Sequence, residues 1–125
     1  MEFYVSVALG GALGALTRYA ITIFFQLHYS STIPWGTIFA NVVGSFLMGI
    51  LFIILQEKFA QNEVLKGLLA VGFLGAMTTF SSFSLETLIM LQKGNFTYAF
   101  GYVIASVGLC LMAAYIGIQV ARSWM

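Results

Sequence analysis

Four long apolar stretches constrain the fold of this chain. Each is long enough to form a helix of roughly 20 residues, the length that crosses a hydrocarbon layer ~30 Å thick. Only short polar segments separate them. A lipid-facing barrel would show short strands of alternating apolar and polar residues instead. The sequence therefore predicts an all-α membrane protein with a single transmembrane domain over residues 1–125, with helices near Phe3–Leu27, Trp35–Gln56, Leu65–Leu91 and Phe96–Ala121.

Composition favours a lipid bilayer as the surroundings and argues against nucleic acid as a partner. Hydrophobic residues make up 61% of the chain and charged residues 7%, whereas about a quarter of the residues in soluble proteins are charged. The formal net charge is +1 and the basic residues are scattered, so no basic surface for nucleic acid is expected. The short connections favour one compact bundle of antiparallel neighbours.

The distribution of basic residues leaves the orientation in the membrane weakly specified. With four crossings, both termini and the loop over residues 57–64 share one side, which carries Lys58, Lys66 and Arg122, against Lys93 and Arg18 on the other. Orientation follows the Lys/Arg imbalance near helix ends, and this imbalance is small. Insertion in both orientations is consistent with it, and one fixed orientation with the termini inside fits equally well.

The third apolar stretch contains a dense polar cluster between Gly75 and Glu86. Five hydroxyl side chains lie in this segment, and an unpaired polar group in hydrocarbon costs several kcal/mol. Gly72 and Gly75 precede Thr78 and Thr79, a pattern typical of places where membrane helices unwind. We predict a break near Gly75–Thr79. Carbonyls freed there can hold a cation, and freed N–H groups and hydroxyls can meet an anion.

Two phenylalanines follow the predicted break. Phe80 and Phe83 are three residues apart and share a helix face, beside Thr79, Ser82 and Glu86. The edge of a benzene ring is positive, so an edge directed at a polar path can favour a small anion. Ordinary packing is the alternative for phenylalanines at this spacing.

Polar residues repeat every four positions in two other helices. In the second stretch Thr37, Asn41 and Ser45 share a face, and in the fourth Tyr102 and Ser106 do so. Their N–H and O–H donors can line an anion path. Such side chains also join helices to one another in membranes, so interhelical hydrogen bonding is the alternative.

The first stretch combines small residues with a charge. Gly10, Gly14 and Arg18 fall at steps of four, and small residues at this spacing allow another helix to approach closely. An arginine at membrane depth needs water, an anion or a cage of carbonyls. The alternative is a side chain that extends to the membrane surface.

Side chains for catalysis are missing from the predicted helices. His28 lies in a loop, Cys110 is the single cysteine, and no pair of carboxylates occurs in the apolar stretches. A metal centre built from side chains, a Ser-His hydrolase and an acid–base dyad each need residues that are absent. The chain is therefore not expected to be an enzyme.

Three sequence motifs resemble those of a known family, the small fluoride channels of the Fluc (CrcB) type. They are Gly10–Tyr19 with its glycines and arginine, Gly36–Phe46 around Asn41, and Gly72–Phe83 across the predicted break. The motifs occur in the expected order and are embedded in four helices of matching length. Together they are far more specific than any one of them.

The resemblance implies a passive fluoride channel that exports fluoride from the cytoplasm across the inner membrane of a prokaryote. It further implies an antiparallel, dual-topology homodimer with two fluoride pores, each lined by both subunits, and a structural sodium ion at the dimer interface. By position, the pore residues are Asn41, Thr37, Phe80, Phe83, Thr79, Ser81, Ser82, Tyr102 and Ser106, the vestibule or pore-end residues are Arg18 and Glu86, and the sodium ligands are the backbone carbonyls of Gly75 and Thr78.

Two other functions remain as alternatives. A small proton-coupled multidrug exporter can also use four helices, but it needs a carboxylate deep in the membrane, and Glu86 is expected toward the end of the third helix. A structural or assembly subunit that conducts nothing is the other alternative.

Overall fold

A computed structural model describes all residues 1–125 as helices joined by short connections, with no strand. Four helical bodies are long and apolar enough to cross a membrane, which confirms the predicted fold class. Three are single helices: α1 (Glu2–His28), α2 (Trp35–Lys58) and α6 (Phe96–Trp124). The remaining body is divided into α3 (Glu63–Leu65), the π-helical segment η1 (Lys66–Leu74), α4 (Gly75–Met77) and α5 (Ser81–Gln92).

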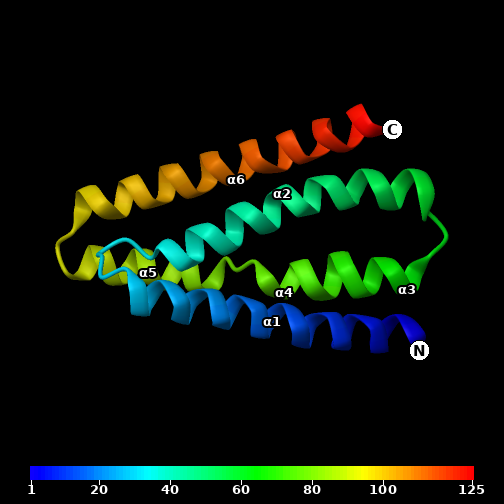
Figure 1. Ribbon diagram of the computed structural model, residues 1–125. Helices are drawn as coiled ribbons and strands as arrows, with labels where there is room; N and C mark the ends of the chain where they lie inside the picture. Colours follow the sequence, from blue (N-terminus) through cyan, green and yellow to red (C-terminus); the bar gives the residue numbers. More distant parts are fainter.

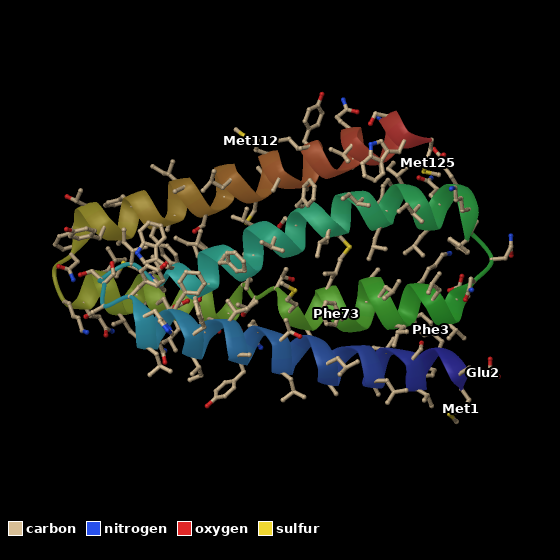
Figure 2. The ribbon with its side chains drawn as sticks, in the orientation of Figure 1. Met1, Glu2, Phe3, Phe73, Met112 and Met125 are labelled. Atoms are coloured by element: carbon tan, nitrogen blue, oxygen red, sulfur yellow. The ribbon has the colours of Figure 1, made fainter.

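The four bodies run side by side along one long axis (Figure 1). Both chain termini lie at one end, together with the connection between α2 and α3, while the α1–α2 loop and the α5–α6 turn lie at the other. Met1 and Met125 mark the end with the termini in Figure 2. The observed helices extend slightly beyond the predicted bounds, because polar residues such as Glu2 and Lys58 continue the last turns.

Glycines set the distances between the packed helices. A Cβ on Gly10 or Gly14 of α1 would collide with the backbone of Leu68 or Phe73 in η1. In the same way, a Cβ on Gly49 of α2 or Gly117 of α6 would strike the backbone of the other helix. Contact at backbone distance provides the van der Waals packing that holds helices together where water is absent. The structure thus pairs α1 with η1 and α2 with α6.

The third body is interrupted, as predicted, but the interruption lies at Thr78–Phe80. Gly75 keeps helical angles (φ −61°, ψ −37°), whereas Thr78 is extended (φ −87°, ψ 156°). The wide π-helical turns over Lys66–Leu74 precede it. Glycine permits unwinding without requiring it, and the chain leaves the helix where hydroxyl side chains and neighbouring helices supply partners for the freed backbone groups.

The outer faces of the bundle are apolar. Met112 projects from α6 away from α2 (Figure 2) and is one of many large apolar side chains exposed on this chain. Gly101 and Gly108 of α6 also face open space, since a Cβ added to either would meet nothing within 4 Å. These faces suit lipid or another helix.

Candidate functional site

The break in the third body is held by a side chain from α2. The Asn41 Nδ2 donates to the Thr79 carbonyl at 3.0 Å, and the Thr79 N–H donates to the Asn41 Oδ1 at 2.7 Å. One amide side chain therefore satisfies both backbone groups of a residue that has left the helix. An asparagine amide carries two N–H donors, so one remains beyond the bond to Thr79. The structure thus gives Asn41 a structural role, which the resemblance does not mention.

A side chain from α1 contacts the same break. The Arg18 Nε donates to the Ala76 carbonyl at 3.0 Å. Ala76 belongs to the short α4, directly before the extended residues. Of the partners considered for an arginine at this depth, the structure provides a carbonyl, and the side chain is half-buried.

Glu86 accepts hydrogen bonds from two other helices. The Thr37 hydroxyl donates to its two carboxylate oxygens at 2.8 and 3.0 Å, and the Tyr102 hydroxyl donates to the Oε1 at 3.2 Å. Thr37 is 6% exposed and Tyr102 is 2% exposed. The carboxylate is therefore half-buried between α2, α5 and α6 and lines the cavity at the loop end of the bundle.

The two phenylalanines of the predicted aromatic pair occupy different environments. Phe83 is 8% exposed and its ring packs against Tyr102, with ring centroids 5.1 Å apart. Phe80 is 76% exposed, although its ring centroid lies only 5.5 Å from that of Phe83 at an interplanar angle of 55°. One ring of the pair thus belongs to the core and the other projects from the single chain.

The hydroxyl groups after the break divide into paired and unpaired ones. The Thr79 Oγ1 accepts from the Ser82 N–H at 3.2 Å and lies 3.3 Å from the Ser81 Oγ, so it caps the start of α5. Ser106, one turn from Tyr102 on α6, is 5% exposed, and its Oγ has no hydrogen-bond partner. A buried hydroxyl without a partner is unfavourable, which makes Ser106 the clearest unused donor in the bundle.

Two cavities meet at this set of side chains. A cavity of about 590 Å³ opens at the loop end of the bundle, and one of about 480 Å³ reaches Arg18, Thr79 and Ser82 beside the break. Both are lined by Thr22, Thr37 and Glu86, so they adjoin. We name the combined surface the polar groove and define it by Arg18, Thr22, Thr37, Thr79, Ser82 and Glu86.

The break also leaves carbonyls without partners. None of the hydrogen bonds in the chain ends on the carbonyl oxygen of Gly75 or Thr78, while those of Ala76 and Thr79 accept from Arg18 and Asn41. Carbonyl oxygens are suitable ligands for a hard cation. The two carbonyls expected to bind sodium are therefore chemically suited to that ion.

Thr22 lines the site and the contact of Gly44 with Thr78 lies beside it, and neither was predicted from the sequence. Thr22 follows Arg18 by four residues and lines both cavities, so extending the series of steps of four in α1 would have found it. Gly44 leaves room for the methyl group of Thr78. No local signal marks that contact, because it joins α2 to a residue far along the chain.

The fold and the polar groove define a multi-pass membrane protein that gathers its polar groups within an apolar bundle. A family model described as CrcB-like protein, Camphor Resistance (CrcB), matches residues 5–118. The chain is 47% identical to a protein of Magnetococcus marinus named fluoride-specific ion channel FluC. The alignment spans 116 residues, which are 93% of this chain and 94% of that relative. A protein of Shewanella baltica with the same name is 46% identical over 123 residues, or 98% of each chain. The chain belongs to the CrcB-like family, which confirms the resemblance inferred from its motifs.

Proposed function

We propose that this protein is a fluoride-selective channel that exports fluoride passively from the cytoplasm across a prokaryotic inner membrane and thereby confers fluoride resistance. The names of its full-length relatives support fluoride as the ion. The observation that carries the proposal is the polar groove itself, which leads from the loop end of the bundle to the break between α4 and α5. Polar side chains within membrane-spanning helices are energetically costly, and where they line a cavity they usually mark the path of an ion or a polar substrate.

Transport requires replacement of the water around fluoride by donors of the protein. Hydroxyls of Thr79, Ser81 and Ser82 and the spare N–H of Asn41 provide such donors at the break, and the positive ring edges of Phe80 and Phe83 can follow them. The Thr37 hydroxyl would join them by exchanging its bond to Glu86 for one to the ion. From α6, Ser106 would supply its unpaired hydroxyl, and Tyr102 would supply a hydroxyl that exchanges its bond to Glu86 for one to the ion. Larger halides fit a narrow path of donors poorly, and no carboxylate ring attracts cations.

Each pore would be completed by a second copy of the chain. Phe80 projects from the single subunit, and Gly75 is exposed next to the break. An exposed aromatic ring beside uncommitted polar groups suits a protein interface better than lipid. In an antiparallel homodimer with two pores, the exposed Phe80 ring and the carbonyls at the break would each face the partner subunit.

The backbone carbonyls of Gly75 and Thr78 would hold the structural sodium ion at the dimer interface. When bound, that ion would supply positive charge next to the breaks and join the two subunits. The chain prepares these carbonyls through Arg18 and Asn41, which bind the adjacent carbonyls of Ala76 and Thr79.

The experiment that tests the proposal compares two halides in the same purified protein. Liposomes loaded with fluoride or chloride are diluted into impermeant buffer, and efflux is followed with ion-selective electrodes. We expect fluoride efflux without chloride efflux. Equal leakage of both ions, or of neither, would refute the proposed channel.

One observation supports a second candidate, a proton-coupled exporter of cationic compounds. Glu86 is half-buried within the helices, and such exporters need a carboxylate within the membrane. Uptake of a cationic dye driven by a proton gradient in the same liposomes, lost in Glu86→Gln, would favour this candidate over the channel.

A further inference from the structure

The mouth of the polar groove contains two charged side chains of opposite sign. Among the residues that line the loop-end cavity of about 590 Å³, only Glu86 and Lys93 are charged. Glu86 lies at the inner side, where the cavity adjoins the one that reaches the break. Lys93 follows α5 and lies near the α1–α2 loop at the end of the bundle.

Negative charge on α5 repels an anion inside this mouth. The carboxyl end of α5 carries the negative pole of the helix dipole, equivalent to roughly half an elementary charge. The carboxylate of Glu86 lies two turns farther in, seven positions before Lys93 and on nearly the same face of the helix. The N-terminus of α2 at Trp35–Thr37 also lines this cavity and supplies a partly compensating positive pole. The Glu86 carboxylate remains as the full negative charge that a nearby cation must offset.

The backbone fixes Lys93 at this position. The Gly94 N–H donates to the Leu91 carbonyl at 3.1 Å and the Asn95 N–H donates to the Met90 carbonyl at 2.8 Å. These two bonds form a Schellman motif, which requires a left-handed residue after the helix, and Gly94 meets that requirement with φ 80°. Lys93 is thus the residue that ends α5, and the motif holds its Cα at the rim.

The Lys93 ammonium is not committed to any other group. The single ion pair of the chain joins Lys66 to Glu63, and the Lys93 side chain makes no hydrogen bond within the chain. Lys93 is also exposed. The charge is therefore available to the cavity and to the ions in it.

We propose that the positive charge of Lys93 attracts fluoride to the mouth. It raises the local concentration of fluoride there and offsets the negative potential of Glu86 and the α5 terminus. This inference rests on the proposed fluoride channel and adds a residue that determines how readily the ion reaches the groove. A unit charge ~10 Å from an ion in water changes its local concentration about twofold when screening is weak.

The test measures fluoride current or efflux at limiting fluoride concentration for the wild-type protein, Lys93→Gln and Lys93→Arg. Ionic strength is varied with an impermeant salt between ~0.01 M and ~1 M, where the screening length falls from ~30 Å to ~3 Å. We expect Lys93→Gln to reduce the rate about twofold at the low ionic strength and to equal the wild type at the high one. Lys93→Arg keeps the charge and should behave as the wild type throughout.

A relocated charge separates electrostatics from local structure. Gln26 lines the same cavity from α1, so Gln26→Lys in the Lys93→Gln background should restore most of the lost rate at low ionic strength. A Lys93→Gln rate equal to the wild type at every ionic strength, or a loss that salt does not diminish, would overturn the inference. If the wild-type protein itself conducts no fluoride, the proposed function fails instead, and the two failures are distinguished by this one measurement.

Discussion

Replacement of Asn41 by alanine should destabilise the protein more than its size suggests. The substitution removes the 3.0 and 2.7 Å bonds that pair both backbone groups of Thr79. Hydrogen bonds between transmembrane side chains contribute ~0.6 kcal/mol each on average, which sets a lower bound of about 1 kcal/mol for two. Leaving two fully buried groups unpaired would cost ~1–3 kcal/mol each, which sets an upper bound of about 6 kcal/mol for the half-buried Thr79.

The stability lost in Asn41→Ala depends, between these bounds, on whether residues 78–80 can return to a helix. If Thr79 returns to a helix, its N–H can bond to the Gly75 carbonyl, which is free in the structure, and the cost falls toward the lower bound. If packing of Phe80 and Phe83 prevents this, both groups remain unpaired. We expect the second situation, and therefore a loss of about 2–4 kcal/mol.

The assay is reversible unfolding of the purified protein in mixed micelles by added sodium dodecyl sulfate, followed by tryptophan fluorescence. Ser45→Ala is the matched control, because Ser45 lies one turn from Asn41 on the same helix and its side chain makes no hydrogen bond in the chain. A change below ~0.5 kcal/mol for Asn41→Ala, or one equal to that of Ser45→Ala, would refute the reasoning that Asn41 holds the break.

Three further outcomes are expected. Thr37→Val should cost ~1.5–3 kcal/mol by removing the bifurcated bond to the Glu86 carboxylate at 2.8 and 3.0 Å, and more than Tyr102→Phe, which removes a longer bond of 3.2 Å. Unfolding in micelles gives the order, and the reverse order would contradict it. Arg18→Gln should lower fluoride efflux at least tenfold, with little recovery in Arg18→Lys because the bond to Ala76 comes from the guanidinium; full activity in the lysine variant would disprove this role. Gly14→Ala should cost ~1–3 kcal/mol by pushing α1 from η1, visible as a lower temperature at which the purified protein aggregates, and an unchanged temperature would show that α1 can shift without loss.

The four membrane spans could be predicted because hydrophobicity and length alone determine them. The bilayer requires about 20 apolar residues for each crossing, and no tertiary contact is needed to recognise such segments. The position of the break, in contrast, was predicted only approximately, because it depends on tertiary contacts. Glycine and hydroxyl residues mark where a helix can open, but the exact residues depend on partners from other helices, here Asn41 of α2 and Arg18 of α1.

Pairings within the site were not accessible from the sequence. Arg18 meets a carbonyl 58 residues away, and Thr37 meets a carboxylate 49 residues away. Periodicity placed Thr37 and Asn41 on one face of α2, but the same face can bind an ion or another helix. The resemblance places Glu86 near a pore end, but its hydrogen bonds to Thr37 of α2 and Tyr102 of α6 depend on how α5 packs against those helices.

Residues around the break and the polar groove fall into two groups with different physical tasks. Asn41 and Arg18 bind backbone groups that the break has freed, so their first contribution is to keep a helix open inside an apolar bundle. The Ser106 hydroxyl has no partner in the single chain, and the Phe80 ring is largely exposed beside Phe83. Loss of the first group should lower stability and transport together, because the groove closes or the bundle loosens.

Loss of the second group should lower transport while stability stays the same or increases. Ser106→Ala removes a buried hydroxyl that has no partner, and such a change is neutral or stabilising when no bond is lost. A variant that is at least as stable as the wild type yet conducts fluoride more slowly would therefore identify Ser106 as a donor to the ion. A less stable Ser106→Ala would instead show that its hydroxyl is paired within the assembled protein, since only a lost bond can account for the difference.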